Sequence, residues 1–276
     1  MSLRFAYNTN GAANHRLDDA LKLIADTGYD GVALTLDHHH LDPFASDWQR
    51  EADRVARLLE TLNMGSVIET GARYLLDPRD KHEPTLVTAS PEGRARRVDF
   101  LVRALDIAAL LGSETVSFWA GVPKAGIERE DAMRWLGEGL TQVLDHAERI
   151  GIAASFEPEP GMLIETVTDY AALHIRHPRL RLALDTGHCL VTEDIGPADA
   201  VRRYATRLGT VAIEDMKLGD HTHLPFGQGD MDVPAVLDAL DEIDFPGLVC
   251  VELSRESPRA HAAIPEAIEY LRQVRA

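Results

Sequence analysis

The chain is short of cysteine and has no long apolar run, and each shortage excludes a class of protein. Its 276 residues include two cysteines, Cys189 and Cys250, which are too few for a disulfide framework and form no CxxC pair. No apolar run approaches the ~20 residues of a membrane span, and residues 2–4 do not open a secretory signal. We therefore expect a cytoplasmic protein that is not embedded in a membrane.

Basic residues are also scarce, with 28 Lys and Arg against 45 Asp and Glu and a net charge of −17. Such a surface repels phosphate backbones, so no nucleic-acid partner is expected. Asn8–Ala13, which follows the first expected strand, lacks the GxGxxG pattern of an open, doubly wound dinucleotide-binding sheet. Hydrophobic residues make up 45% of the chain, enough for one large core in a single domain.

Short apolar runs of strand character alternate with amphipathic helical periodicity along the whole chain. The expected strands are Leu3–Asn8, Gly31–Leu36, Ser66–Glu69, Thr115–Trp119, Ile152–Glu157, Leu182–Asp185, Thr210–Glu214 and Leu248–Glu252. The expected helices are Leu17–Thr27, Asp47–Leu62, Glu92–Leu111, Arg129–Ile150, Val167–His174, Ala198–Tyr204, Val233–Ile243 and Ile264–Val274. Strands and helices that alternate in this way indicate parallel crossovers. The sequence predicts an α/β fold, a single-domain (β/α)8 TIM barrel over residues 1–276.

Four of the expected strands end in a carboxylate, namely Glu157, Asp185, Glu214 and Glu252. A carboxylate at the end of a buried strand is costly unless it binds something, and a TIM barrel builds its active site from strand C-terminal ends. One such glutamate more often caps or forms a salt bridge, but four at corresponding ends favour a divalent-metal site for a small polar substrate. For Glu214 an ion pair with nearby Lys217 is an equally good interpretation.

Histidines accompany these carboxylates. His188 lies three residues after Asp185 across a Thr-Gly turn, and His221 and His223 lie on a loop behind the seventh strand. Oxygen ligands combined with one or two imidazoles suit Mg²⁺, Mn²⁺, Co²⁺ or Zn²⁺. We expect His223 to be a metal ligand, whereas His221 is the less certain of the two.

Three further features are expected to flank the mouth of the barrel. Trp119, at the end of the fourth strand, either stacks on a substrate or closes the barrel. The run His38–His40 follows the second strand, and adjacent loop histidines more often face solvent than bind metal. The long segment 73–89 follows the third strand and is either a lid or a solvated loop.

Several of these segments resemble the xylose isomerase-like TIM barrel superfamily, which includes sugar epimerases, inosose dehydratases and AP endonuclease family 2, the endonuclease IV type. The residues that carry the resemblance are Phe156–Pro158, Leu184–His188, Gly227–Asp232 and Val251–Glu252. The resemblance covers nearly the whole chain. Within the superfamily, Glu69–Arg73 and Ile213–Lys217 resemble an EboC-like branch of the sugar phosphate isomerase/epimerase-like proteins.

The resemblance implies one metal held by a Glu, an Asp, a His and a Glu at the ends of strands five to eight. These positions match Glu157, Asp185, Ala212 and Glu252, so this chain departs from the family at the seventh strand. Glu214, two residues beyond Ala212, faces the same side of an extended strand and is one candidate replacement.

The histidines offer a second replacement for the missing ligand. His188 matches a substrate-contacting histidine of the epimerases, whereas His221 and His223 match loop ligands of the nuclease branch. We therefore hypothesise that the metal has moved toward these three histidines.

The expected function is that of a metal-dependent isomerase or epimerase (EC 5 class), acting on a sugar or sugar-like polyol ketone by proton transfer next to a carbonyl. Glu157 and Glu252 would exchange the proton, and His188 and Trp119 would contact the substrate. The cofactor would be one or more divalent ions, Mn, Mg, Co or Zn. Alternatives are a metal-dependent dehydratase of a cyclic polyol ketone, an endonuclease IV-like phosphodiesterase, and a non-catalytic barrel with a degraded metal site. The oligomeric state is left open, a homodimer included.

Overall fold

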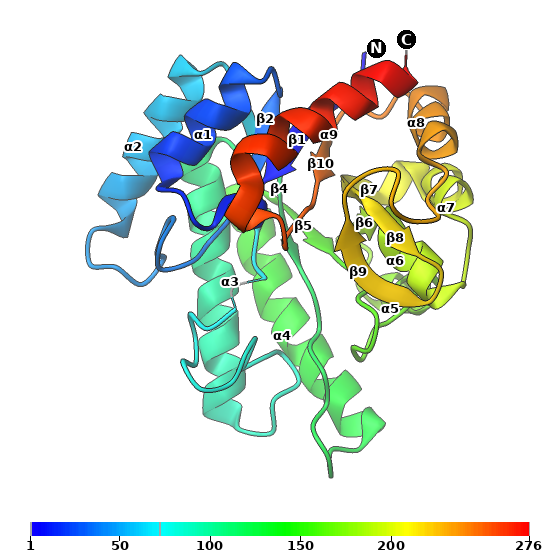
Figure 1. Ribbon diagram of the computed structural model, residues 1–276. Helices are drawn as coiled ribbons and strands as arrows, with labels where there is room; N and C mark the ends of the chain where they lie inside the picture. The colour runs from blue at the N-terminus through cyan, green and yellow to red at the C-terminus, as the bar shows by residue number, and fades with distance from the viewer. Residues whose placement is uncertain (1, 72, 276) are drawn as a thin grey trace.

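A closed barrel of parallel strands forms the centre of the protein, and helices surround it (Figure 1). The computed structural model describes residues 2–71 and 73–275. Ala72, which belongs to the Glu69–Arg73 motif, lies outside the described residues. The predicted (β/α)8 barrel is confirmed.

The barrel strands are β1 Arg4–Asn8, β2 Gly31–Thr35, β3 Gly65–Glu69, β4 Thr115–Phe118, β5 Ala153–Phe156, β6 Arg181–Asp185, β7 Leu208–Ile213 and β10 Leu248–Val251. The helices are α1 Leu17–Asp26, α2 Trp48–Thr61, α3 Pro91–Leu111, α4 Arg129–Ile150, α5 Val167–Arg176, α6 Thr186–Thr192, α7 Pro197–Arg203, α8 Val233–Glu242 and α9 Ala260–Val274. The order around the barrel is β1-β10-β7-β6-β5-β4-β3-β2, which brings the first and last strands together. Each predicted strand and helix is present, with ends that move by a few residues.

Two features near the mouth of the barrel were not predicted. The helix α6 begins directly after β6, and an antiparallel hairpin of β8 (Asp215–Lys217) and β9 (Asp220–Leu224) follows β7. Gly219, with φ +70°, makes the tight turn between the two short strands. His221 and His223 therefore lie on β9 and not on an irregular loop, because the turn folds this polar segment back on itself.

The core has two layers because parallel strands are buried on both faces. Small residues such as Ala6, Ala33 and Val67 fill the inside of the barrel together with Leu248 and Cys250. A larger apolar cluster lies between the strands and the surrounding helices. Within the described residues, no helix has both the length and the apolar character needed to cross a bilayer.

Packing inside the barrel is tight where Gly31 and Gly65 pair in register on β2 and β3. A Cβ added at Gly31 would lie 2.6 Å from the carbonyl oxygen of Gly65 and 2.8 Å from Leu248, whereas a Cβ added at Gly65 meets no atom closer than 3.5 Å. We therefore expect Gly31→Ala to lower the free energy of unfolding by about 1–3 kcal/mol, as overpacked cores do.

Chemical denaturation measures this difference, and Gly65→Ala is the matched control because it adds the same methyl to the neighbouring strand. We expect the control to change stability by less than about 1 kcal/mol. Equal effects of the two substitutions would contradict the packing described for this end of the barrel.

Candidate active site

A cavity of about 640 Å³ lies at the carboxyl ends of the barrel strands. Among the residues predicted to form the site, those that line it are Trp119, Glu157, His188, His221, His223 and Glu252. Asp185 lines a smaller space below, inside the barrel, and Glu214 is fully buried behind it. The structure thus brings the predicted residues to one end of the barrel, in two layers.

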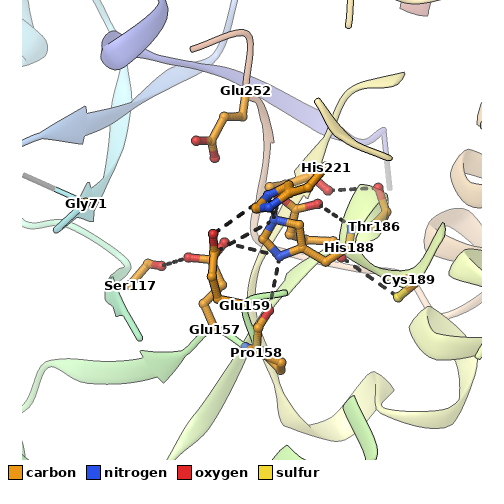
Figure 2. Close-up of polar contacts among 12 residues, drawn as sticks. Gly71, Ser117, Glu157, Pro158, Glu159, Thr186, His188, Cys189, His221 and Glu252 are labelled. Atoms are coloured by element: carbon orange, nitrogen blue, oxygen red, sulfur yellow. Dashed lines mark hydrogen bonds and ion pairs between the residues drawn. The ribbon is translucent and has the colours of Figure 1, made fainter. Parts of the chain in front are cut away.

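The chain direction after β6 places His188 over the mouth. Asp185 caps α6, since its Oδ1 accepts a hydrogen bond of 3.1 Å from the backbone N–H of His188. His188 Nδ1 lies 3.1 Å from the carbonyl oxygen of Pro158, which can only accept, so Nδ1 carries the proton. Nε2 of His188 is therefore left to accept, and Figure 2 shows the ring between Pro158 on one side and His221 and Glu159 on the other. The predicted Thr-Gly turn is the first turn of a helix.

The two candidate proton-transfer residues come from different sides of the mouth (Figure 2). Glu157 follows β5, and its Oε2 accepts a hydrogen bond of 3.3 Å from the hydroxyl of Ser117. Glu252 follows β10, and its Oε1 accepts one of 2.9 Å from the side-chain amide of Asn10. Burial, and then the nearby acids Glu159 and Glu252, raise the pKa of Glu157 well above its usual range.

Beneath the cavity, the carboxyls of Asp185 and Glu214 are buried next to each other. Asp185 Oδ2 and both carboxyl oxygens of Glu214 lack a partner of good hydrogen-bond geometry among the described residues, but the two carboxyls are close enough to share a proton, because burial and Asp185 raise the pKa of Glu214 well above its usual range. Donor atoms of Asp185, Glu214 and His223 lie within 4.8 Å of one another. The alternative of an ion pair between Glu214 and Lys217 is not supported, because Glu214 is fully buried while Lys217 is exposed. Buried carboxylates of this kind need a proton or a cation, so the residues present fit a divalent ion.

Glu159 belongs to the site, although we did not predict it from the sequence. Its Oε2 lies 3.8 Å from His188 Nε2, and its Oε1 lies 3.7 Å from His221 Nε2. Burial raises the pKa of Glu159 to about 7, although His188 partly offsets the effect. The sequence signal was a second carboxylate two residues after Glu157, but the loop beyond β5 sets its direction.

Glu69 was also missed as a site residue. Its carboxylate accepts hydrogen bonds from the hydroxyl of Thr35, at 2.8 Å, and from the N–H of Gly71. Burial, and then Glu252, raise its pKa to about 7. Glu69 ends β3 as Glu157 and Glu252 extend β5 and β10, so the same strand-end rule would have found it.

His221 contacts His188 directly, with 3.1 Å between their Nε2 atoms. Burial and His188 lower the pKa of His221 to about 4, so His221 is neutral near pH 7. Burial alone would also lower the pKa of His188, but Asp185 and Glu159 raise it above its ordinary value. The two rings therefore differ in their tendency to hold a proton.

The remaining predicted features lie around the cavity wall. Trp119 is 4% exposed and stacks on the guanidinium of Arg97 at 4.3 Å, so it closes the wall beside β4. His38–His40 line the outer rim, where donor atoms of His38, His39 and Asp37 lie within 4.8 Å of one another. Segment 73–89 adds Lys81 and other residues to the lining, so a role as a lid stays a prediction.

The Gly227–Asp232 motif follows β9 and supports the hairpin. The buried carboxylate of Asp215 accepts hydrogen bonds from the N–H groups of Gly227, at 2.8 Å, and Met231, at 3.0 Å. A Cβ at Gly229 would lie 2.3 Å from the same carboxylate, so this position has room only for glycine. The motif therefore fixes the loop that leads from the hairpin back to α8.

The comparison with known families agrees with this geometry. The sequence model described as "Xylose isomerase-like TIM barrel" matches residues 21–274. The chain belongs to this family. A curated relative, the L-ribulose-5-phosphate 3-epimerase UlaE of Salmonella paratyphi A, is 23% identical over 252 residues, which cover 89% of this chain and 86% of the relative.

Solved structures extend the likeness of fold. An L-ribulose 3-epimerase aligns with a TM-score of 0.80 at 20% identity, over 99% of this chain and 94% of its own. The D-allulose 3-epimerase of Methylomonas sp. aligns with a TM-score of 0.76 at 20% identity, over 98% and 96%. The zinc-bound IolI protein aligns with a TM-score of 0.77 at 20% identity, over 99% and 98%. The family barrel is thus shared along the whole chain.

The buried carboxyls make stability depend on pH. Glu69 has a pKa of about 7 in the folded protein against an ordinary value of 4.5. Below about pH 4.5 it is protonated in both states and its burial carries no charge penalty. Between about pH 4.5 and pH 7, Glu69 is ionised in the unfolded chain but still protonated in the folded protein. The free energy of unfolding therefore falls over this range, by about 3 kcal/mol in total from this group. In the presence of a chelator, we expect the melting temperature to fall between pH 5 and pH 8.

Thermal unfolding with chelator, and again with added Mn²⁺ or Zn²⁺, measures this dependence. The melting temperature of Glu69→Gln should fall less between pH 5 and pH 8 than that of the unsubstituted protein. An added cation should reduce the fall in melting temperature of the unsubstituted protein. An equal fall in Glu69→Gln and in the unsubstituted protein would show that Glu69 does not hold the raised pKa.

Proposed function

We propose that this protein is a metal-dependent epimerase that moves a proton at the carbon next to the carbonyl of a sugar-like ketose. The observation that carries the proposal is the placement of Glu157 and Glu252 on different sides of one cavity, each with one oxygen held by a neighbour. Family membership and the similarity to sugar epimerases support the reaction class. A volume of about 640 Å³ suits a small sugar.

Proton transfer from two sides explains inversion at one carbon. Glu157 takes the proton from one face of the substrate, and Glu252 returns a proton to the other face; the roles exchange in the reverse reaction. A raised pKa suits Glu157 to this work, because a base that binds its proton more tightly removes one from carbon more readily. Ser117 and Asn10 hold the two carboxylates in position.

Other residues supply charge and orientation. A divalent cation, when bound by the carboxylates and imidazoles at this mouth, supplies Lewis-acid polarisation of the substrate oxygens. Glu69 and Glu159, with pKa values of about 7, are able to donate a hydrogen bond to a substrate oxygen when protonated. Trp119 forms part of the wall against which the substrate lies.

The narrower parts of the expected function stay predictions. These are the likeness to the EboC-like branch and the cytoplasmic location. A dehydratase would use the same carboxylates but release water, so analysis of the products separates it from an epimerase. No separate observation favours the phosphodiesterase.

Substitution of each carboxylate alone tests the two-sided mechanism. In Glu157→Gln and in Glu252→Gln we expect epimerisation to fall by roughly 100-fold or more, because one face of the carbon loses its base. Each variant should still exchange the substrate proton with solvent deuterium for the epimer that faces the remaining carboxylate. Deuterium incorporation into both epimers of five- and six-carbon ketoses, measured by NMR, is the readout.

Glu138→Gln is the matched control, since this exposed glutamate lies on α4 outside the cavity lining. It should epimerise at the unsubstituted rate. Undiminished epimerisation in Glu157→Gln would refute the proposal, and loss of exchange for both epimers in one variant alone would point to a single shared base.

A further inference from the structure

Four donor groups converge at one side of the mouth, around His188 Nε2, and Figure 2 shows three of them, those of His188, His221 and Glu159. His221 Nε2 lies 3.1 Å from this atom, Asp185 Oδ2 lies 3.4 Å from it, and Glu159 Oε2 lies 3.8 Å from it. Glu159 Oε1 lies 3.7 Å from His221 Nε2. Donors that share one ion at about 2.1 Å are separated from one another by about 3.0–3.4 Å, and His221 and Asp185 already lie at such distances from His188 Nε2. Glu159, whose two oxygens each face a different imidazole, would have to move closer to bind the same cation.

The hydrogen bonds around the cluster leave these donors free to bind. His188 keeps its proton on Nδ1 for the carbonyl of Pro158, which is the usual support of a metal-binding imidazole and leaves Nε2 as a lone pair. Asp185 is 3% exposed; its Oδ2 lies 3.4 Å from His188 Nε2, and its carboxylate also faces the buried carboxyl of Glu214. A hydrogen bond between the two imidazoles would satisfy His188 and His221, but the charge of the buried Asp185 would then be balanced only by a proton on Glu214 or by a cation.

The ligand set implied by the family is incomplete in this chain. Ala212 pairs in register with Asp185 on β6 and with Cys250 on β10, so the barrel wall between them carries only a methyl group. Glu157 and Glu252, the other two members of that set, accept hydrogen bonds from Ser117 and Asn10.

We propose that the divalent cation binds to Glu159, Asp185, His188 and His221, displaced from the barrel axis toward the β8–β9 hairpin. Two imidazoles and two carboxylates suit Zn²⁺, Co²⁺ or Mn²⁺. Glu157 and Glu252 then lie outside the ligand set and are free to carry protons. The proposal deepens the proposed function and rests on it for what the cation does, but its position is independent of any turnover.

The histidines differ in this arrangement. Donor atoms of His188, His221 and His223 all lie within 4.8 Å of one another, and those of His223 also lie near Asp185 and Glu214. Of the two hairpin histidines, His221 is the one whose Nε2 lies 3.7 Å from Glu159 Oε1, so the proposed set takes His221 and leaves His223 beside Glu214. Glu159 has no counterpart in the ligand set implied by the family, and in this proposal it is a ligand of the cation.

Titration of the metal-free protein with Co²⁺, followed by its visible absorption spectrum and by equilibrium dialysis, tests this ligand set without any substrate. We expect Glu159→Gln and His221→Ala each to weaken Co²⁺ binding by roughly 100-fold or more, because even residues that only support a ligand contribute about 10–100-fold. The d–d absorption of bound Co²⁺ should also change, since the variants lose an oxygen or a nitrogen donor.

Glu252→Gln is the matched control for Glu159→Gln, and His223→Ala is the matched control for His221→Ala. Both should bind Co²⁺ within a few-fold of the unsubstituted protein, and circular dichroism checks that all four variants are folded. If Glu252→Gln lost Co²⁺ binding while Glu159→Gln retained it, the proposal would be overturned in favour of the ligand set that the family implies. If His223→Ala weakened Co²⁺ binding as much as His221→Ala, the proposal would be overturned in favour of a site with three histidines. An epimerase assay that fails while these binding results hold would reject the proposed function and not the site.

Discussion

The burial of carboxylates at one end of the barrel is the constraint on which the rest of the structure depends. Glu69, Glu157, Glu159 and Glu214 all have pKa values raised chiefly by burial, and each also feels the charge of at least one other acid. An isolated buried carboxylate is unfavourable, and a group of them is more so. Protons and histidines neutralise part of the group, and the proposed cation would neutralise more of it. The need to neutralise these carboxylates and the proton-transfer chemistry proposed for the site both follow from their burial.

Barrel closure provides the geometry. Parallel strands bring their carboxyl ends to one face, so acids that are far apart in the sequence meet without long connections. The Asp185 cap turns the chain at once into α6 and brings His188 back over the cavity. The β8–β9 hairpin, fixed by Asp215, brings His221 to the same place from the opposite side. The rigid barrel thus places the acids, and its loops place the imidazoles.

Much of this could be predicted from the sequence because strand periodicity and strand-end residues are local signals. The barrel, its element order and the placement of Glu157, Asp185 and Glu252 at one mouth followed from apolar runs that end in an acid. Glu69 was equally visible by that rule. The orientation of His188 could not be predicted from the sequence, because it depends on the carbonyl of Pro158, 30 residues away in the chain.

Residues outside the strands were harder to place. The direction of Glu159 is set by the loop after β5, and strand periodicity does not extend into loops. The hairpin was missed because β8 and β9 are short and polar, with no apolar alternation to mark them as strands. Their pairing follows from Gly219 and from Asp215, which acts on residues 12 and 16 positions further along.

The alanine at position 212 has a consequence for the rate at which a cation enters and leaves. A ligand on a barrel strand moves only when the barrel moves, and the barrel is the most stable part of the fold. In this chain an imidazole of the proposed site lies instead on a two-stranded hairpin, which is held by the carboxylates of Asp215 and Asp230 and by a backbone hydrogen bond from Gly219 to Leu190. Such hairpins open locally, on times far shorter than unfolding. At the proposed site, fluctuations of the hairpin would therefore govern the residence time of the cation, so that metal exchange would be a local event that leaves the barrel intact.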